Sequence, residues 1–232
     1  MTVVSSIRRY PVKAMGGEGL TAVDVDARGL VGDREFAVVE ADGRLASGKD
    51  SGRFRRRDAV FDHAAATVGD GVLVRDDDGR TWPVDDPALA THLSQRLGAP
   101  VRVLAEADAS HHDDGPVSLV GTATLRWCAE QWGVDADPRR LRVNLVVATD
   151  EPFVEESWLG ARLAVGSAIL AVESRIERCR TVDVAQDGAS AEGRLLKPLA
   201  AHRDMCLAVY SRALRAGTVH VGDGVTVVPS PA

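Results

Sequence analysis

The chain lacks the features that mark several common classes of protein. Its only three cysteines, Cys128, Cys179 and Cys206, lie far apart and form no CxxC pair, so neither a disulfide framework nor a zinc-finger spacing is present. No run of about 18 apolar residues occurs, which excludes a membrane-spanning helix. The first residues also lack the apolar region of a signal peptide. Free thiols without such segments favour a reducing, cytoplasmic location.

Aromatic residues and positive charge are also scarce. Aromatic side chains make up 4% of the 232 residues, and the formal net charge is −6. An extended nucleic-acid surface needs clustered Lys and Arg, often with aromatic rings for stacking. We therefore expect neither a nucleic acid nor a membrane as partner. Any anion site must be a local basic patch on an acidic background.

The pattern of apolar and turn-forming residues predicts mostly strands and tight turns. Hydrophobic residues make up 45% of the chain and charged residues 27%, which is ordinary for a globular protein. Alternating apolar residues predict strands in the segments 2–12, 20–47, 72–84, 99–104, 140–148, 162–179 and 211–228. The predicted fold class is therefore mainly β with a few helices, in a barrel-like arrangement.

Two segments predict helices, and a polar stretch separates them. The first helix has Asp86 as N-cap, Pro87 at its first position and Gly98 just past its end. The second spans residues 122–133 and has Leu125, Cys128, Ala129 and Trp132 on one face. The stretch EADASHHDDGP, at 106–116, is interpreted as the boundary between a domain of residues 1–106 and a domain of residues 107–232.

Cys179 has different neighbours from the other two cysteines. Cys128 lies on an apolar helix face and Cys206 in the apolar run MCLAVY, so both are expected to pack in the core. Cys179 follows a predicted strand, and three arginines lie within four residues of it: Arg175, Arg178 and Arg180. Guanidinium groups stabilise a thiolate, which is the nucleophilic and metal-binding form. A surface thiol whose charged neighbours face water is the alternative.

Other polar clusters could bind a small anion. Lys13 and Arg34 stand beside turn residues, and Gly29 and Gly32 permit backbone conformations that expose amides. RLRVN, on a predicted strand, would place Arg140, Arg142 and Asn144 on one face. Each pattern also fits a plain turn or an exposed strand face.

Two further clusters are expected to be solvated. The arginines of GRFRRRD, at 52–58, form either a solvated face or a site for one small anion. Adjacent His111 and His112 point to opposite faces of an extended segment, which favours a solvated linker over a metal site.

Taken in order, these segments resemble the MOSC domain family, named for the C-terminal domain of molybdenum-cofactor sulfurases. The first half is similar to the β-barrel domain that precedes MOSC in the mitochondrial amidoxime-reducing component and its bacterial relatives. The matching stretches are YPVKA (10–14), GLVGDREF (29–36), PVSLVGTATL (116–125), RLRVN (140–144), FVEESW (153–158), RLAVGSAIL (162–170), ERC (177–179) and GTVHVGDGV (217–225). Their order and spacing, over nearly the whole chain, carry the resemblance. It implies a MOSC-type β-barrel with a smaller N-terminal barrel-like subdomain.

The resemblance also implies a cofactor and its ligands. Cys179 would ligate the molybdenum of the molybdenum cofactor (Mo-molybdopterin), a pairing that suits a soft thiolate. Lys13, Arg34, Arg142 and Asn144 would bind the pterin and its phosphate. Ala14 and Gly121 stand where the family often has serine, so Thr122 or Thr124 is expected to supply a hydroxyl.

Three functions remain as hypotheses. The leading one is a molybdenum-dependent oxidoreductase that reduces small N-hydroxylated or N-oxide substrates. Its electrons would come from a separate ferredoxin or flavin-reductase type protein, because no ferredoxin-like cysteine cluster follows residue 200. The second is a sulfur carrier or transferase that forms a persulfide on Cys179. The third is a non-catalytic cofactor- or anion-binding module. The loop after Cys179 is shorter than in the amidoxime-reducing members, which leaves the substrate open.

Overall fold

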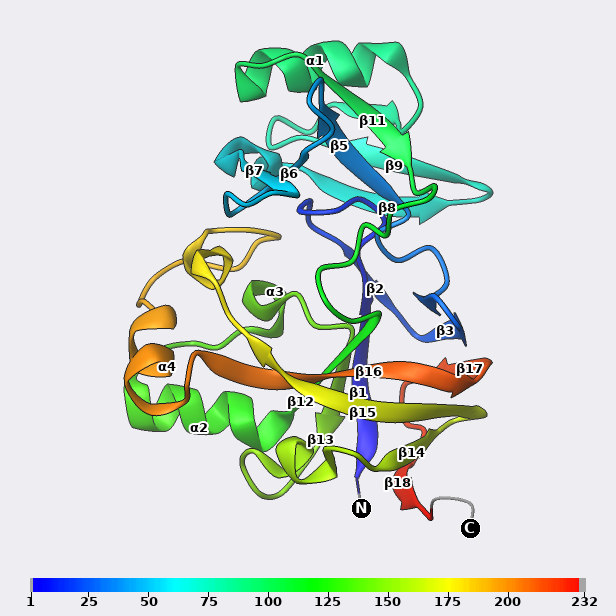
Figure 1. The fold of residues 1–232 in the computed structure, drawn as a ribbon, viewed down its shortest axis with the longest axis vertical. Coiled ribbons are helices and arrows are strands. Elements are labelled where there is room, and N and C mark those ends of the chain that lie inside the picture. Colours follow the sequence, from blue (N-terminus) through cyan, green and yellow to red (C-terminus); the bar gives the residue numbers. More distant parts are fainter. Residues whose placement is uncertain (1, 230–232) are drawn as a thin grey trace.

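The computed structural model describes residues 2–229, and β-strands dominate them. Figure 1 shows a larger body at the bottom, where both chain ends lie, and a smaller body above it. The four α-helices within the described residues are α1 (Pro87–Leu97), α2 (Thr122–Trp132), α3 (Pro138–Leu141) and α4 (Leu196–His202). The predicted fold class, mainly β with a few helices, is confirmed. No helix of the described residues is long and apolar enough to span a bilayer.

The larger body is built on an eight-stranded sheet. In spatial order its strands are β18 (Val225–Val228), β14 (Arg162–Val165), β15 (Ala168–Glu177), β16 (Cys206–Arg215), β12 (Val117–Gly121), β13 (Leu145–Ala148), β1 (Val3–Arg9) and β2 (Glu18–Leu20). Neighbours pair antiparallel except β12 and β13. A parallel pair needs a long crossover, and α2 and α3 lie in the connection between these two strands. A second sheet of this body contains β17 (Gly217–His220), β3 (Ala22–Asp26) and β4 (Gly29–Leu30).

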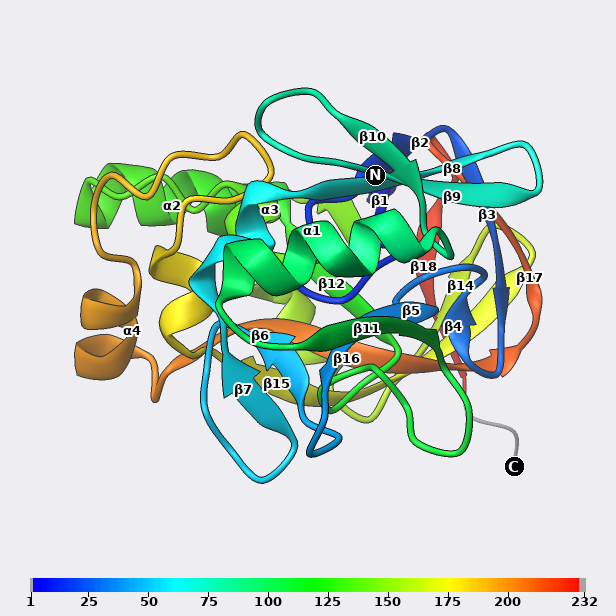
Figure 2. The same cartoon turned by 90° about the horizontal axis from the view of Figure 1, so that it is seen from above.

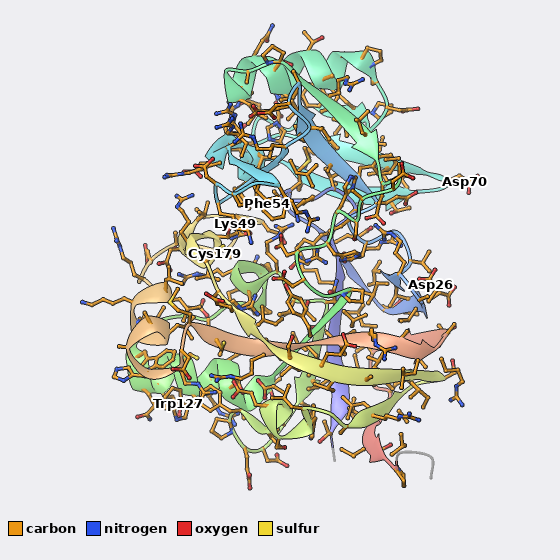
Figure 3. All side chains as sticks on the ribbon, viewed as in Figure 1. Asp26, Lys49, Phe54, Asp70, Trp127 and Cys179 are labelled. Carbon is orange, nitrogen blue, oxygen red and sulfur yellow. The ribbon has the colours of Figure 1, made fainter. Side chains whose placement is uncertain are left out.

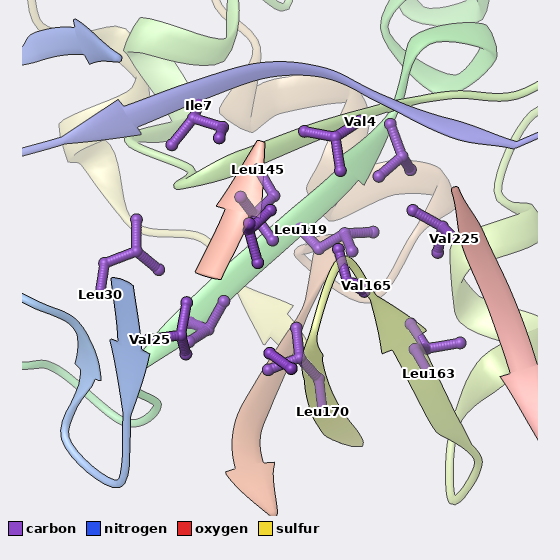
Figure 4. Close-up of a cluster of buried hydrophobic side chains, with 14 of the residues drawn as sticks. Val4, Ile7, Val25, Leu30, Leu119, Leu145, Leu163, Val165, Leu170 and Val225 are labelled. Carbon is purple, nitrogen blue, oxygen red and sulfur yellow. The ribbon is translucent and has the colours of Figure 1, made fainter. Parts of the chain in front are cut away.

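One apolar cluster holds these sheets together, and Figure 4 shows it in close-up. Leu119 of β12, Leu145 of β13 and Leu170 of β15 are fully buried in it, beside Val4 and Ile7 of β1. Val4 and Ile7 of β1 are three residues apart, and the register of the β1–β13 pair shifts between Val4 and Ser6, which lets both side chains face the core. The cluster therefore fixes the strand ends from which the candidate site is built.

The smaller body joins two sheets with one helix. The first sheet has the order β11 (Val101–Ala105), β5 (Phe36–Glu40), β6 (Leu45–Ser47) and β7 (Phe54–Arg56). The second is β10 (Thr81–Pro83), β9 (Gly71–Arg75) and β8 (Ala64–Val68), preceded by the 3-10 helix η1 (Asp58–Asp62). Viewed from above, α1 lies across the top of this body (Figure 2), and it contacts β11 and η1.

The limits of α1 confirm the expected caps. The Asp86 side chain accepts a hydrogen bond from the backbone N–H of Ala88 at 2.8 Å, and Gly98 ends the helix at a φ of 65°. A positive φ of this kind favours glycine. The buried residues Leu89, Leu93 and Leu97 follow the helical repeat and face the core of the smaller body.

The first 30 residues link the two bodies. β1, β2 and β3 belong to the sheets of the larger body, where β1 pairs with β13 and β3 pairs with β17. Between β1 and β2 the chain rises into the smaller body, where Val12 bridges Phe36 and Gly16 bridges Ala64. The expected division at residues 106 and 107 stays a prediction, but the first strands pack with the C-terminal half.

Three local predictions need correction. Residues 138–141 form the helix α3 and Arg142 follows it with a φ of 52°, so RLRVN is not a strand and its side chains share no face. Asp137 caps α3 by accepting from the N–H of Arg139, and Pro138 favours a helix start. His111 and His112 are buried rather than solvated. Cys206 is partly exposed, whereas Cys128 is buried as expected.

Replacing Leu119 with alanine tests the role of the central cluster. Because Leu119 is fully buried, the truncation should lower the free energy of unfolding by about 2–5 kcal/mol. Leu214→Ala is the matched control, since this leucine is 39% exposed and should change stability by about 0.5 kcal/mol or less. Urea unfolding monitored by Trp fluorescence measures both, and equal losses would contradict the assignment.

Candidate functional site

A pocket lies where the two bodies meet, and its walls come from both. Its volume is about 840 Å³ with its open mouth. Six cationic side chains and three carboxylates line it. The lining residues are Lys13, Ala14, Arg34, Ser47, Lys49, Phe61, Asp113, Asp114, Gly115, Ser118, Arg140, Leu141, Arg142, Asn144, Ile176, Glu177, Arg178, Cys179, Thr181, Val182 and Tyr210. Figure 3 shows Cys179, Lys49 and Phe54 at this junction.

The Tyr10 ring organises the positive charge behind the pocket. The guanidinium carbons of Arg142, Arg34 and Arg8 lie 4.3, 5.0 and 5.8 Å from its ring centroid. An aromatic face attracts cations, and the attraction grows when both groups are desolvated. Tyr10 is fully buried, and this burial raises the pKa of its hydroxyl to about 12. The ring therefore stays neutral while it holds the arginines together.

Arg34 and Arg142 reach this ring from left-handed backbone positions. Their φ angles are 50° and 52°. The Arg34 guanidinium pairs with the fully buried Asp33 and donates to the Arg142 carbonyl at 3.0 Å. Burial lowers the pKa of Arg34, but Asp33 more than reverses this and leaves it above the ordinary value. Burial lowers the pKa of Arg142 to about 10, so both arginines remain charged at neutral pH.

Asn144 lines the pocket, but its side-chain amide forms hydrogen bonds with residues of the neighbouring strands. Its Oδ1 accepts from the backbone N–H and the hydroxyl of Ser118, at 3.1 and 2.9 Å. Its Nδ2 donates to the carbonyl of Arg8 at 3.2 Å. The side chain thereby ties β12 to the end of β1, in addition to facing the pocket.

Lys13 is a buried cation with a local counterion. Its Nζ donates to the His111 carbonyl at 2.6 Å and to Asp113 at 3.0 Å, and it lies 4.7 Å from the Phe54 ring centroid. Burial lowers the pKa of Lys13 to about 8, although Asp113 opposes the shift. Lys13 is therefore a charged side chain at neutral pH that loses its proton more readily than an exposed lysine.

Cys179 stands at the end of β15, where the chain turns into the 3-10 helix η3 (Arg180–Asp183). The thiol is partly exposed and donates a hydrogen bond to the hydroxyl of Thr181 at 3.2 Å. Thr181 in turn lies so close to Gly48 that a Cβ at Gly48 would stand 2.4 Å from its hydroxyl oxygen. Gly48 therefore lets the smaller body approach the cysteine loop.

Only one of the three arginines flanking Cys179 in the sequence lines the pocket. Arg175 pairs with Glu156 and donates to the Arg203 carbonyl, and Arg180 pairs with Asp58. Arg178 is buried and donates to the carbonyls of Leu207 and Leu141, both at 2.8 Å. The cations near the thiol thus come mainly from distant parts of the chain, which the local sequence did not indicate.

Arg178 also carries an unused donor. Its Nη2 is buried and has no hydrogen-bond partner among the described residues. Burial lowers the pKa of this arginine to about 10, so it remains charged at neutral pH. A buried guanidinium N–H without a partner is costly unless something accepts from it. Its position beside Cys179 in the pocket wall makes it a candidate anion contact.

Arg140 anchors the loop that follows Cys179 through hydrogen bonds to backbone carbonyls. This arginine is 1% exposed. It donates to the carbonyls of Val182, Asp135 and Gly193 at 2.8, 2.6 and 2.8 Å. The same loop meets the basic cluster, since Gln186 Oε1 accepts from Arg142 at 3.2 Å and Asp187 pairs with Arg8. The structure therefore gives Arg140 a supporting role that differs from the expected shared strand face.

Thr122 and Thr124 do not line the pocket. Both belong to α2, beyond the far end of β12, where Thr122 bonds to the backbone of Thr149 and Thr124 donates to the buried Glu155 at 3.0 Å. A serine at Gly121 would force Thr149 to move, because an added Cβ would lie 2.6 Å from the Thr149 hydroxyl oxygen. The hydroxyls that do line the pocket belong to Ser47, Ser118, Thr181 and Tyr210.

The arginine cluster at 53–57 is engaged in internal contacts. Arg53 donates to the carbonyls of Ser110 and His112, at 2.5 and 3.1 Å. Arg55 and Arg57 approach Glu40, and Arg56 pairs with Asp58. Arg53 thereby ties the 106–116 loop to the smaller body, and none of these four arginines lines the pocket.

Family models match almost the whole chain. The model described as "MOSC N-terminal beta barrel domain" matches residues 1–99, and the model described as "MOSC domain" matches residues 106–226. A search of curated proteins finds no match.

The comparison with solved structures concerns the fold. The YuaD protein from Bacillus subtilis has a TM-score of 0.54 at 16% identity, over 97% of this chain and 94% of that one. YiiM from Geobacillus stearothermophilus gives 0.41 at 14% identity, over 68% and 71% of the two chains. At such identity the likeness to YuaD shows the fold alone, and the likeness to YiiM supports no argument.

The ion pair between Lys13 and Asp113 predicts the titration of Lys13. Asp113 raises the pKa of Lys13 against the effect of burial, so Asp113→Asn should lower this pKa below its value of about 8. Asp114→Asn is the matched control, because Asp114 lines the same pocket without bonding to Lys13. NMR titration of the lysine ε-carbon measures both. An unchanged pKa in Asp113→Asn would contradict the ion pair.

The contacts of Arg140 predict a stability effect centred on the cysteine loop. Arg140→Met leaves several carbonyls without donors, so the free energy of unfolding should fall by about 3 kcal/mol or more. Amide hydrogen exchange should rise most over residues 182–193. Arg126→Met, at an exposed position of α2, should change neither quantity measurably. Uniform loss of protection across both bodies would argue against a local anchoring role.

Proposed function

The chain belongs to the MOSC domain family, and from that premise we propose that it binds the molybdenum cofactor and reduces small N-hydroxylated or N-oxide compounds. Cys179 would be the protein ligand to molybdenum. Lys13, Arg34 and Arg142 would provide the positive surroundings of the pterin and its phosphate, and Asn144 would hold the strand ends in place. Electrons would come from a separate protein of ferredoxin or flavin-reductase type.

One observation carries the proposal: a partly exposed thiol opens into the same pocket as five arginine or lysine side chains from other segments. These five are Lys13, Arg34, Lys49, Arg140 and Arg142, and Arg178 beside the cysteine is the sixth cation of the pocket wall. A soft sulfur ligand suits a transition metal with accessible redox states. Guanidinium groups suit a phosphate, with which they form two-pronged hydrogen bonds.

The residues present fit such a cofactor. The buried Nη2 of Arg178 lacks an acceptor among residues 2–229, and a polyanionic ligand can supply one. Lys49 is partly exposed at the mouth and lies 3.9 Å from Asp113, so an anion can compete for it. Ala14 lines the pocket without a hydroxyl, and Ser47 and Ser118 offer hydroxyls nearby. Thr122 and Thr124, the residues expected for that role, have their hydroxyls engaged elsewhere.

The chemistry divides between the bound group and the chain. When bound, the molybdenum centre supplies two-electron redox chemistry and accepts an oxygen atom. Reduction of an N-hydroxyl compound to the amine consumes two electrons and two protons and releases one water. The chain's part is to hold the thiolate at the pocket wall and to surround the anionic group with fixed positive charge. The loop of Gln186 and Asp187, held by Arg142 and Arg8, would border the substrate.

Metal retention tests this proposal. After expression in a host that makes the cofactor, with ample molybdate, purified wild-type protein should contain molybdenum and release a fluorescent pterin on heating. Cys179→Ala should lose most of the molybdenum, because its sulfur ligand is gone. Cys206→Ala is the matched control, since Cys206 is also partly exposed but lies outside the pocket, and it should retain the wild-type content. Mass-spectrometric metal analysis and pterin fluorescence are the measurements.

Three outcomes would redirect the assignment. Wild-type protein without molybdenum or pterin would overturn it. A reducible mass gain of one sulfur atom on Cys179 in the absence of pterin would favour the persulfide-forming sulfur carrier instead. Equal molybdenum in wild type and Cys179→Ala would leave cofactor binding but remove the cysteine as the ligand.

A further inference from the structure

A second group of metal-ligating side chains lies in the smaller body. His63 follows η1, Asp76 follows β9, and His92 projects from the middle of α1. The Nε2 atoms of His63 and His92 face each other at 3.1 Å. Asp76 Oδ2 lies 3.6 Å from the same Nε2 of His92. Three segments separated in the sequence thus bring two imidazoles and a carboxylate to one place.

The hydrogen bonding of His63 fixes its tautomer. Its Nδ1 lies 3.1 Å from the Ala59 carbonyl, and a carbonyl only accepts, so Nδ1 carries the proton. In the neutral ring Nε2 then has a free lone pair directed at His92. A backbone carbonyl on the other ring nitrogen is the usual partner that orients a metal-binding histidine.

The Asp76 carboxylate supplies an independent observation. Asp76 is 5% exposed. Its Oδ1 accepts from the Arg80 backbone N–H at 2.8 Å, but its buried Oδ2 has no hydrogen-bond partner among the described residues. A single N–H on His92 Nε2 cannot satisfy both His63 Nε2 and this oxygen. A cation held by the two imidazoles, with this oxygen joining it after a side-chain rotation, would satisfy all three atoms, and a buried carboxylate oxygen without a hydrogen bond is otherwise costly.

The surroundings also favour a cation. Asp62, His63, Asp76 and Asp77 line an open pocket of about 1310 Å³ with its mouth, distinct from the pocket of Cys179. The ligand oxygens of Asp76, Asp77 and Asp78 lie within 4.8 Å of one another. Arg96 and Arg80 pair with this acidic group, Arg80 also with Asp76 Oδ2 at 3.6 Å, and Arg75 lines the same pocket, so four carboxylates face three guanidiniums. The pocket gives an ion a route of entry and room for a water ligand.

We propose that His63, His92 and Asp76 bind one divalent transition-metal ion of the zinc type. Two imidazole nitrogens and one carboxylate oxygen form a common ligand set for zinc, with water in the remaining position. Two ligands of one zinc ion stand roughly 3.3 Å apart, close to the two separations that the structure gives. The full triple is not yet within 4.8 Å, so binding includes a side-chain rotation that brings His63 and Asp76 together.

The proposed ion would stabilise the smaller body. It would join α1 to the hairpin of β8 and β9, which α1 already meets through the ion pair of Arg96 with Asp77, while His92 stacks on Trp82 of β10 with ring centroids 4.5 Å apart. A ligand that binds only the folded state raises its stability in proportion to the logarithm of the ligand concentration over Kd. The site is therefore structural, and it is independent of the function proposed for Cys179.

Zinc titration of metal-free protein tests the proposal. The measurements use the Cys179→Ala background, so that the thiol of the other pocket cannot contribute. Calorimetry should show one zinc ion per chain, and thermal unfolding should shift upward with zinc concentration. His92→Asn and, separately, Asp76→Asn should weaken binding by roughly a hundredfold or more and abolish the thermal shift. Circular dichroism checks that both variants are folded.

A histidine elsewhere provides the control. His220→Asn changes an exposed residue of β17 that pairs with Asp223 at 3.5 Å, and it should leave the stoichiometry and the thermal shift unchanged. Cobalt in place of zinc should give the absorption of a four-coordinate nitrogen–oxygen site in wild type and lose it in His92→Asn. Absence of binding at roughly micromolar zinc, or equal binding by wild type and His92→Asn, would overturn the proposal.

Discussion

The arrangement of the candidate site depends on one desolvated contact, the buried Tyr10 ring with three guanidinium groups around it. Like charges at this spacing repel strongly in a low-dielectric interior. The aromatic face and the fully buried Asp33 compensate that repulsion, and Asp33 also accepts from the Tyr10 backbone N–H at 2.8 Å. The contact therefore fixes the point where the chain leaves the larger body and the positions of Arg34 and Arg142.

This contact also explains why the site lies between the two bodies. Tyr10 begins the segment that runs from β1 into the smaller body, and Arg34 lies in the turn that precedes β5. Arg142 ends α3, and Cys179 ends β15, both in the larger body. No single element contains two of these side chains, so the site forms only when both cores are packed. Its geometry is a property of the tertiary structure rather than of any local motif.

The sequence therefore predicts helices and strands better than it predicts which residues surround a given side chain in the folded protein. Caps at Asp86 and Gly98 act within a few residues, so the limits of α1 follow from local chemistry. RLRVN was misassigned because apolar alternation resembles a strand, while Asp137 and Pro138 together start a helix. The burial of His111 and His112, and the reach of Arg178 rather than Arg175 toward the pocket, depend on contacts with distant residues. Those contacts leave no periodic signal in a single sequence.

The ion pairs inside the pocket determine which cations are available to a ligand. Arg34 is not free to leave its ion pair for a ligand, because its partner Asp33 is fully buried and also accepts a hydrogen bond from the Tyr10 backbone N–H. Lys13 is paired less firmly, since Asp113 comes from a loop and its side chain is 40% exposed. Arg178 has an unused donor among the described residues. An entering anion would therefore displace Asp113 and engage Lys13, Lys49 and Arg178 directly. Arg34 and Arg142 would act mainly through their fixed charge, because rearranging them would disrupt the Tyr10 contact.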